Sequence, residues 1–183
     1  AASDVYKRQQ HLLSGLPIFI DDRSGVTMQY IRGIARMMHK RGQCKVLFID
    51  YLQLLSSTVD KKYNREQEIA QISGQAKALA KELNIPVVLL SQLNRDCEKR
   101  TDKKPELSDL RESGAIEQDA DIVMLVYRPE YYGLKAMDGE PIKNVGKLIV
   151  AKHRDGPVGE VKFSYNESLT KIYGRLLNVG ISV

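Results

Sequence analysis

The segment Val46-Leu47-Phe48-Ile49-Asp50 decides the fold class of this 183-residue chain. It is an apolar run without polar interruption, and it ends in a single carboxylate. A second run of the same kind, Val87-Val88-Leu89-Leu90, follows a long helical stretch and ends in Ser91-Gln92. Strands that are apolar throughout and alternate with helices are typical of a parallel sheet covered on both faces. The sequence therefore predicts an α/β fold.

Helical patterns surround these two strands. Thr27 is placed to cap a first helix that ends near Gly42, and Asn64 with Gln67 predicts a capping box for a longer second one. The first helix has apolar residues at Ile31, Ile34, Ala35 and Met38, and the second at Ile69, Ile72, Ala76, Leu79 and Leu83.

A third apolar run, Ile122 to Tyr127, is stopped by Arg128-Pro129 and is predicted to belong to the same parallel sheet. Ligands of such sheets bind beyond the carboxyl ends of the strands. We therefore expect Asp50, Gln92 and Arg128 at one edge.

The last third of the chain has a different pattern. Glu160 to Tyr165 alternates polar and apolar residues, Lys147 to Ala151 is a second strand-like segment, and Asp155-Gly156 between them is a turn signal. This combination predicts a β-hairpin, which adds antiparallel strands at one edge of the sheet.

Composition limits the class of protein. Hydrophobic residues make up 43% and charged residues 28%, which is ordinary for a globular domain. No apolar run reaches the roughly 18–20 residues that span a bilayer, so we expect no membrane association. Cys44 and Cys97 lack metal-ligand or CxxC spacing, which favours reduced cysteines and a cytoplasmic location. The net charge of +5 is compatible with a polyanionic partner.

Two polar strand ends are candidates for nucleotide chemistry. A carboxylate at the tip of an apolar strand, such as Asp50, is the arrangement that holds Mg²⁺ against nucleotide phosphates. A neutral amide at a neighbouring tip, such as Gln92, can hydrogen-bond a γ-phosphate or the water that attacks it. Taken singly, each also suits an ordinary cap or turn.

Two further segments carry cations. In Arg111-Glu112-Ser113-Gly114 the glycine allows close approach of the backbone to a phosphate, and the arginine supplies a planar donor. Lys152 and Arg154 lie two residues apart near the predicted hairpin turn, so their side chains should point to the same side. Solvated charged turns are the alternative for both segments.

The order of these segments resembles the bacterial replicative DNA helicase family of the DnaB type. Ile49 to Leu54 is similar to its Walker B segment, and Ser91 to Arg95 to its sensor motif. Leu107 to Asp121 looks like its most characteristic stretch, and Ala151 to Gly159 resembles its trans-acting finger hairpin. The resemblance runs from about residue 16 to residue 173.

The resemblance implies a RecA-like three-layer sandwich that assembles as a ring-shaped homo-hexamer. It implies ATP and Mg²⁺ as cofactors, translocation on single-stranded DNA with unwinding of the duplex at the fork, and primase and a helicase loader as partners.

The resemblance also implies residue roles. Asp50 coordinates Mg²⁺ in the ATP site, and Gln92 senses the γ-phosphate. Arg154, with Lys152, reaches the nucleotide of the adjacent subunit. The DNA backbone is followed by a loop that contains Arg111, Glu112 and Gly114.

The sequence departs from the pattern in one respect: no segment matches GxxxxGK[ST], the loop that cradles phosphates. We therefore expect residues 10–183 to form a partial motor domain without the first strand and P-loop, with an apolar gap in its sheet and no ATPase activity by itself. Residues 1–9 are expected to be a foreign or disordered segment. The alternative is a non-catalytic RecA-like module that binds single-stranded DNA or a protein partner.

Overall fold

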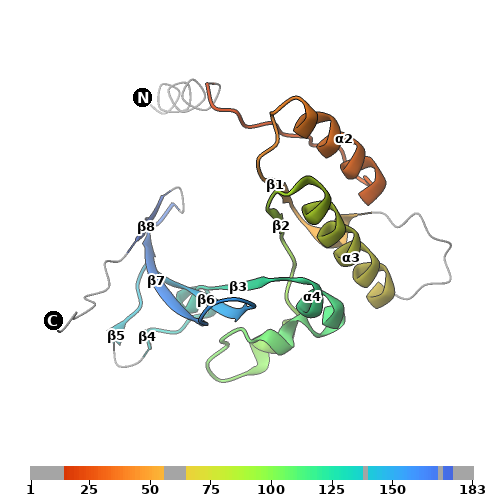
Figure 1. Ribbon diagram of the computed structural model, residues 1–183. Helices are drawn as coiled ribbons and strands as arrows, with labels where there is room; N and C mark the ends of the chain where they lie inside the picture. Colours follow the sequence, from red (N-terminus) through yellow and green to blue (C-terminus); the bar gives the residue numbers. More distant parts are fainter. Residues whose placement is uncertain (1–14, 56–64, 138–139, 169–170, 175–183) are drawn as a thin grey trace.

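The computed structural model describes residues 15–55, 65–137, 140–168 and 171–174 (Figure 1). The segment 1–9, predicted to be foreign or disordered, lies outside these ranges. One part of the molecule consists of helices α2 (Met28–Lys40) and α3 (Arg65–Leu83) with a small parallel sheet, and the other is built on an antiparallel sheet.

Helix α2 begins and ends as its sequence predicts. The Thr27 hydroxyl accepts a hydrogen bond from the Tyr30 backbone N–H at 3.2 Å, which satisfies one of the free donors of the first turn. Gly42 follows the last turn with a φ of +71°, a left-handed conformation that glycine adopts without strain.

Helix α3 buries the predicted apolar stripe. Its buried hydrophobic residues are Ile69, Ile72, Ala76, Leu79 and Leu83. Leu79 is only 1% exposed, so Leu79→Ala should cost about 2–5 kcal/mol of stability. Asn84, with a φ of +51°, follows the helix. The capping box predicted at Asn64 and Gln67 depends on residue 64, which lies outside the described residues.

The two predicted apolar strands form a parallel pair. β1 (Leu47–Ile49) lies beside β2 (Val87–Leu89), with Leu47 opposite Val87 and Ile49 opposite Leu89. Ile49 is buried in a core cluster with Leu52 and residues of α2 and α3. This packing fixes both carboxyl ends at the same edge.

The second sheet is antiparallel and has the strand order β3-β6-β7-β8. Its strands are β3 (Ile122–Tyr127), β6 (Val145–His153), β7 (Gly159–Tyr165) and β8 (Ile172–Gly174). β6 and β7 form the predicted hairpin, which is confirmed. Two short strands, β4 (Ala136–Met137) and β5 (Glu140–Pro141), pair with each other.

The prediction that residues 122–127 belong to the parallel sheet is wrong. β3 pairs with β6 in the antiparallel direction, and buried and exposed side chains alternate along it. A strand whose buried and exposed side chains alternate has only one covered face, as is common in antiparallel sheets. The strands of a parallel sheet are usually buried on both faces. An apolar run alone therefore did not reveal the partner of β3. Arg128 follows this strand and does not belong to the edge formed by β1 and β2.

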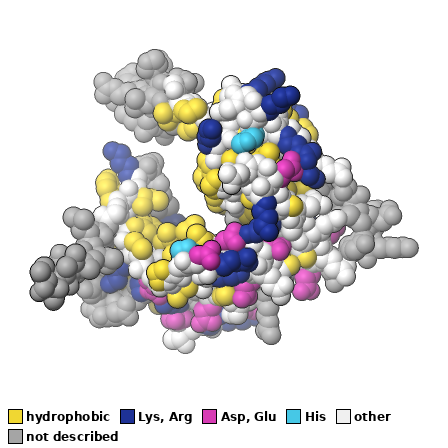
Figure 2. All heavy atoms as spheres, in the orientation of Figure 1, with side chains coloured by type: hydrophobic (Ala, Val, Ile, Leu, Met, Phe, Trp, Pro, Cys, Tyr) yellow, Lys and Arg dark blue, Asp and Glu magenta, His cyan; other side chains and the backbone are white. Residues whose placement is uncertain are grey.

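Apolar side chains remain exposed in both parts of the molecule. Phe48 on β1 is 65% exposed, and Val126 on β3 is 62% exposed, with Met124 beside it on the same face. Figure 2 shows hydrophobic side chains on both sides of a hollow between the helical part and the antiparallel sheet. Within the described residues, no helix has the length and apolar character needed to cross a bilayer.

Candidate functional site

Asp50 directly follows β1, and hydrogen bonds to the chain after β2 hold the backbone on either side of it. The Leu90 N–H donates to the Ile49 carbonyl at 3.0 Å, and the Leu52 N–H donates to the Leu90 carbonyl at 2.9 Å. These bonds hold the backbone on both sides of Asp50. Its carboxylate is exposed and makes no hydrogen bond or ion pair to any described residue, so both oxygens can accept a ligand.

Gln92 follows β2 and is held through its backbone by Gln53. The Gln53 amide donates to the Ser91 hydroxyl at 3.0 Å and to the Gln92 carbonyl at 3.4 Å, and the Gln92 N–H donates to the Gln53 side-chain oxygen at 3.4 Å. The side chain of Gln92 is exposed, and its amide makes no hydrogen bond to a described residue. Sequence reasoning assigned no role to Gln53; its place three residues after Asp50 was the available signal.

The donors at this edge suit Mg²⁺ with phosphates. Mg²⁺ prefers oxygen ligands and is usually held by one or two carboxylates, with water and phosphate oxygens completing its shell. The described residues contain no group of three or more His, Cys, Asp or Glu side chains able to hold a metal by themselves. An exposed carboxylate at the strand edge that also carries the Gln92 amide therefore fits a metal that arrives with a nucleotide.

A small cavity connects this edge to the next segment. It has a volume of about 270 Å³ and is lined by residues that include Gln53, Gln92, Asn94 and Asp109. The Asn94 N–H donates to the Asp109 carbonyl at 3.0 Å. The segment after β2 is thus bonded directly to the 3₁₀ helix η3 (Leu107–Ser113).

η3 and helix α4 (Gly114–Asp119) contain the predicted DNA-binding residues. Arg111 and Glu112 belong to η3, and the exposed Gly114 begins α4. The side chains of residues 111–113 lie outside the described part of the structure, so the assignment of Arg111, Glu112 and Gly114 stays a prediction.

Lys152 and Arg154 do point to the same side, as predicted. Lys152 Nζ donates to the Glu117 carbonyl, and Arg154 Nη2 donates to the Gln118 carbonyl at 3.2 Å. Arg154 also lies 3.4 Å from Asp121, measured from Nε to Oδ1. Both cations thus face the carboxyl end of α4, where exposed carbonyls favour positive charge.

Asp121 bridges the two parts of the molecule. It accepts a hydrogen bond from Lys77 of α3, and this contact holds the pKa of Asp121 below its usual value, with Arg154 acting in the same direction. The structure therefore separates the predicted residues into two groups: Asp50 and Gln92 lie at the edge of the parallel pair, and Lys152 and Arg154 lie at the end of α4.

Comparison with known proteins gives one consistent result. The family described as "DnaB-like helicase C terminal domain" matches residues 2–173. The chain is 48% identical to the replicative DNA helicase DnaB of Rickettsia prowazekii (strain Madrid E), over 96% of this chain and 39% of that protein. It is 42% identical to the replicative DNA helicase DnaC of Bacillus subtilis (strain 168), over 91% of this chain and 35% of that protein.

Two solved structures agree with this result. An ATPase domain superposes with a TM-score of 0.82 at 41% identity, over 89% of this chain and 56% of that one. A DnaB-like replicative helicase, studied together with its interactions with primase, superposes with a TM-score of 0.76 at 42% identity, over 84% of this chain and 37% of that one. The predicted RecA-like α/β fold is thereby confirmed. The chain spans well under half the length of the curated relatives named here, and it belongs to the family of DnaB-like helicase C-terminal domains.

Proposed function

We propose that the protein containing this chain is an ATP-dependent replicative DNA helicase that works as a homo-hexamer, moves along single-stranded DNA and unwinds the duplex at the fork. One observation carries the proposal: Asp50 and Gln92 follow two hydrogen-bonded parallel strands at the same edge, with both side chains available. That is the arrangement needed to hold a metal–phosphate group and to respond to its terminal phosphate.

The chemistry assigned to each residue follows from its donors and acceptors. The Asp50 carboxylate holds Mg²⁺, which neutralises phosphate charge when bound. The Gln92 amide donates to the γ-phosphate or orients the attacking water, while Gln53 keeps its backbone in place. Loss of that phosphate changes the position of Gln92, and the bond from Asn94 to Asp109 passes the change to η3.

Arg154, together with Lys152, serves the nucleotide of the neighbouring subunit in the hexamer. In support, Lys152 lies in β6 and Arg154 directly follows it. Both residues therefore belong to the antiparallel part of the molecule, which does not contain β1 and β2. The Arg154 side chain is 49% exposed, and its described contacts are with a helix end and Asp121, which a phosphate can replace. A finger that acts in trans couples hydrolysis to assembly of the ring.

The segment from Arg111 and Glu112 to Gly114 follows the DNA backbone. It spans the end of η3 and the first residue of α4. Asp109 of the same 3₁₀ helix accepts the bond from Asn94, so DNA contact and nucleotide state are physically linked. Contacts to phosphate should dominate, and affinity should fall steeply with salt. A primase and a loader are the proposed protein partners, and a similar helicase has been studied with primase.

The proposal is tested by Asp50→Asn in the full-length hexamer. Hydrolysis should fall by roughly 100-fold or more, because the amide no longer carries the charge that holds the metal. Asp96→Asn is the matched control and should leave hydrolysis unchanged, since Asp96 is an exposed carboxylate whose one ion pair among the described residues is with its neighbour Lys99. Hydrolysis that is unchanged in Asp50→Asn would remove Asp50 from the metal site. No hydrolysis in the parent protein, with DNA binding indifferent to nucleotide, would instead identify a non-catalytic DNA-binding module.

A further inference from the structure

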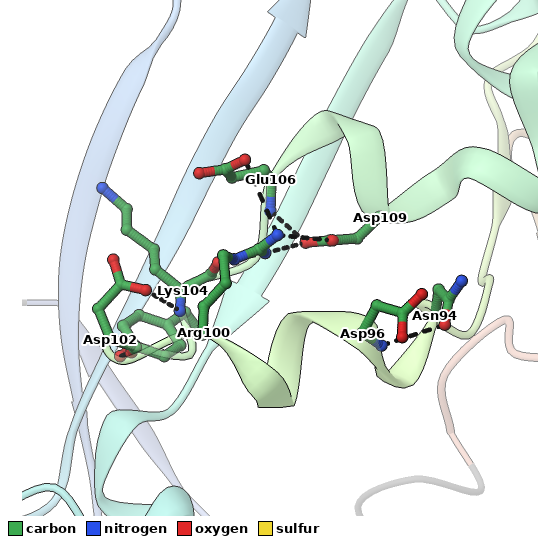
Figure 3. A network of polar contacts seen from close by, with 8 residues as sticks. Asn94, Asp96, Arg100, Asp102, Lys104, Glu106 and Asp109 are labelled. Carbon is green, nitrogen blue, oxygen red and sulfur yellow. Dashed lines mark hydrogen bonds and ion pairs between the residues drawn. The ribbon is translucent and has the colours of Figure 1, made fainter.

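The carboxylate of Asp109, close to the proposed DNA segment, accepts several hydrogen bonds, and Arg100 lies against it (Figure 3). Nη1 of Arg100 donates to Oδ1 of Asp109 at 3.0 Å, and Nη2 donates to Oδ2. Oδ2 also accepts the Glu106 backbone N–H at 2.7 Å. Two parallel bonds from one guanidinium fix the orientation of the carboxylate as well as its distance.

The pair is shielded from solvent. The Asp109 side chain is only 4% exposed, and that of Arg100 is 31% exposed. Burial tends to raise the pKa of Asp109, but the hydrogen bonds from Arg100 and Glu106 outweigh it and hold the pKa below its usual value. Asp109 is therefore ionised at neutral pH, and removing its partner would leave a buried charge uncompensated.

The two residues belong to different segments. Arg100 follows the 3₁₀ helix η2 (Arg95–Lys99), whereas Asp109 lies in the first turn of η3, two residues before Arg111. The Asp109 carbonyl accepts the bond from Asn94, two residues after Gln92. Through its side chain and its backbone, Asp109 thus joins Arg100, the sensor segment and η3 at one point.

We propose that Arg100 is a positioning residue: by holding Asp109 it fixes the segment Leu107–Gly114 in the orientation in which it contacts single-stranded DNA and responds to Gln92. This inference rests on the proposed function, because it takes that segment to be the DNA contact. Arg100 itself does not bind a phosphate in this arrangement. Its Nη atoms face Asp109, and Nη2 also donates to the Lys104 carbonyl at 2.7 Å.

Two substitutions in the full-length hexamer separate positioning from direct contact. Arg100→Gln should weaken binding of a fluorescent oligothymidine by about tenfold or more, since fewer molecules then hold the segment in its binding orientation. Asp109→Asn removes a negative charge, which by itself favours DNA, yet it should weaken binding as well because Arg100 loses its anchor. Both variants should also lose most of the DNA stimulation of ATP hydrolysis.

The salt dependence of DNA affinity distinguishes a positioning residue from a residue that contacts phosphate, because only the loss of a phosphate contact changes its slope. Losing one phosphate contact lowers the slope of log affinity against log salt by about 0.7 for a single strand. Arg100→Gln should keep the parental slope, because it lowers the fraction of protein whose segment is correctly positioned and leaves the phosphate contacts of the bound state in place. Arg100→Lys should recover only part of the affinity, because an ammonium cannot make the two parallel bonds. Lys99→Gln is the matched control: it removes an adjacent, 80% exposed cation and should change neither measurement.

Each outcome has a distinct meaning. A reduced slope in Arg100→Gln, or normal DNA binding in Asp109→Asn, would overturn the positioning role, as would failure of both variants to form hexamers. If Arg111→Ala leaves DNA binding intact, the DNA segment itself is misassigned and the proposed function fails at that point. Weakened binding in Arg111→Ala with normal binding in both Arg100→Gln and Asp109→Asn would reject the positioning role alone.

Discussion

At the scale of single residues, the place of Arg154 predicts a distinctive kinetic result. Arg154→Ala in the full-length hexamer should lower the rate of hydrolysis by roughly 10³-fold or more, as is usual when an arginine finger is removed, and should leave nucleotide binding nearly intact. Steady-state hydrolysis and equilibrium binding of a fluorescent nucleotide measure the two effects. Arg41→Ala, which removes an exposed cation after α2, is the control.

Mixed hexamers show on which subunit Arg154 acts. A subunit with Arg154→Ala retains Asp50, and a subunit with Asp50→Asn retains Arg154. If Arg154 acts in trans, mixing the two inactive variants creates interfaces with both groups intact, and hydrolysis returns. Mixtures as inactive as the separate variants would place Arg154 in the site of its own subunit.

Single residues also show how far sequence reasoning reaches. Asp50 and Gln92 could be singled out because each follows an apolar run, and the shared edge follows from parallel pairing alone. Gln53, Arg100 and Asp109 could not be assigned their roles, because those depend on contacts made only after folding. The bond from Gln53 to Ser91, for instance, joins residues 38 positions apart.

At the scale of elements, Glu82 joins the two helices of the first part. It accepts hydrogen bonds from Arg36 and Arg32 of α2, and these bonds lower the pKa of Glu82 from 4.5 to about 2. A lowered carboxyl pKa stabilises the fold at pH values above the ordinary one, and the contribution disappears as pH falls through the lowered value.

Glu82→Gln should therefore increase hydrogen exchange of the α2 amides at neutral pH. The difference in exchange between variant and parent should stay constant down to about pH 4.5 and shrink between pH 4.5 and 2. Over that range Glu82 of the parent becomes protonated and loses the charge that the glutamine of the variant also lacks. Glu98→Gln, on an exposed residue of η2, serves as the control. A difference that persists unchanged in acid would mean that packing, and not charge, connects the helices.

Elements divide into those the sequence specifies and those it does not. Helix limits were readable because Thr27 and Gly42 are local signals, and the hairpin of β6 and β7 was readable from alternation around a turn. The direction and partner of β3 were not, because apolar residues describe burial and say nothing of which strand supplies the hydrogen bonds. Only β6 in place beside it decides that.

For the whole molecule, the exposed apolar faces predict how the 183-residue chain behaves in isolation. It should bind a hydrophobic dye strongly and scatter light increasingly with concentration, since Phe48, Met124 and Val126 are all more than half exposed. Val126→Thr keeps a β-branched side chain in β3 while adding a hydroxyl, so it should reduce dye binding and scattering without loss of the circular-dichroism spectrum. Dye binding as low as that of a stable monomer would show that these faces are covered in solution.

The contrasting environments of the two thiols have a practical consequence. Cys97 is buried, and this burial raises the pKa of its thiol, whereas Cys44 is partly exposed after α2. Alkylating reagents act on the thiolate, so a maleimide at neutral pH should attach to Cys44 much faster than to Cys97. A fluorophore could thereby be placed on the helical part of each subunit without mutating either cysteine, which would let ring assembly be followed by energy transfer between neighbours.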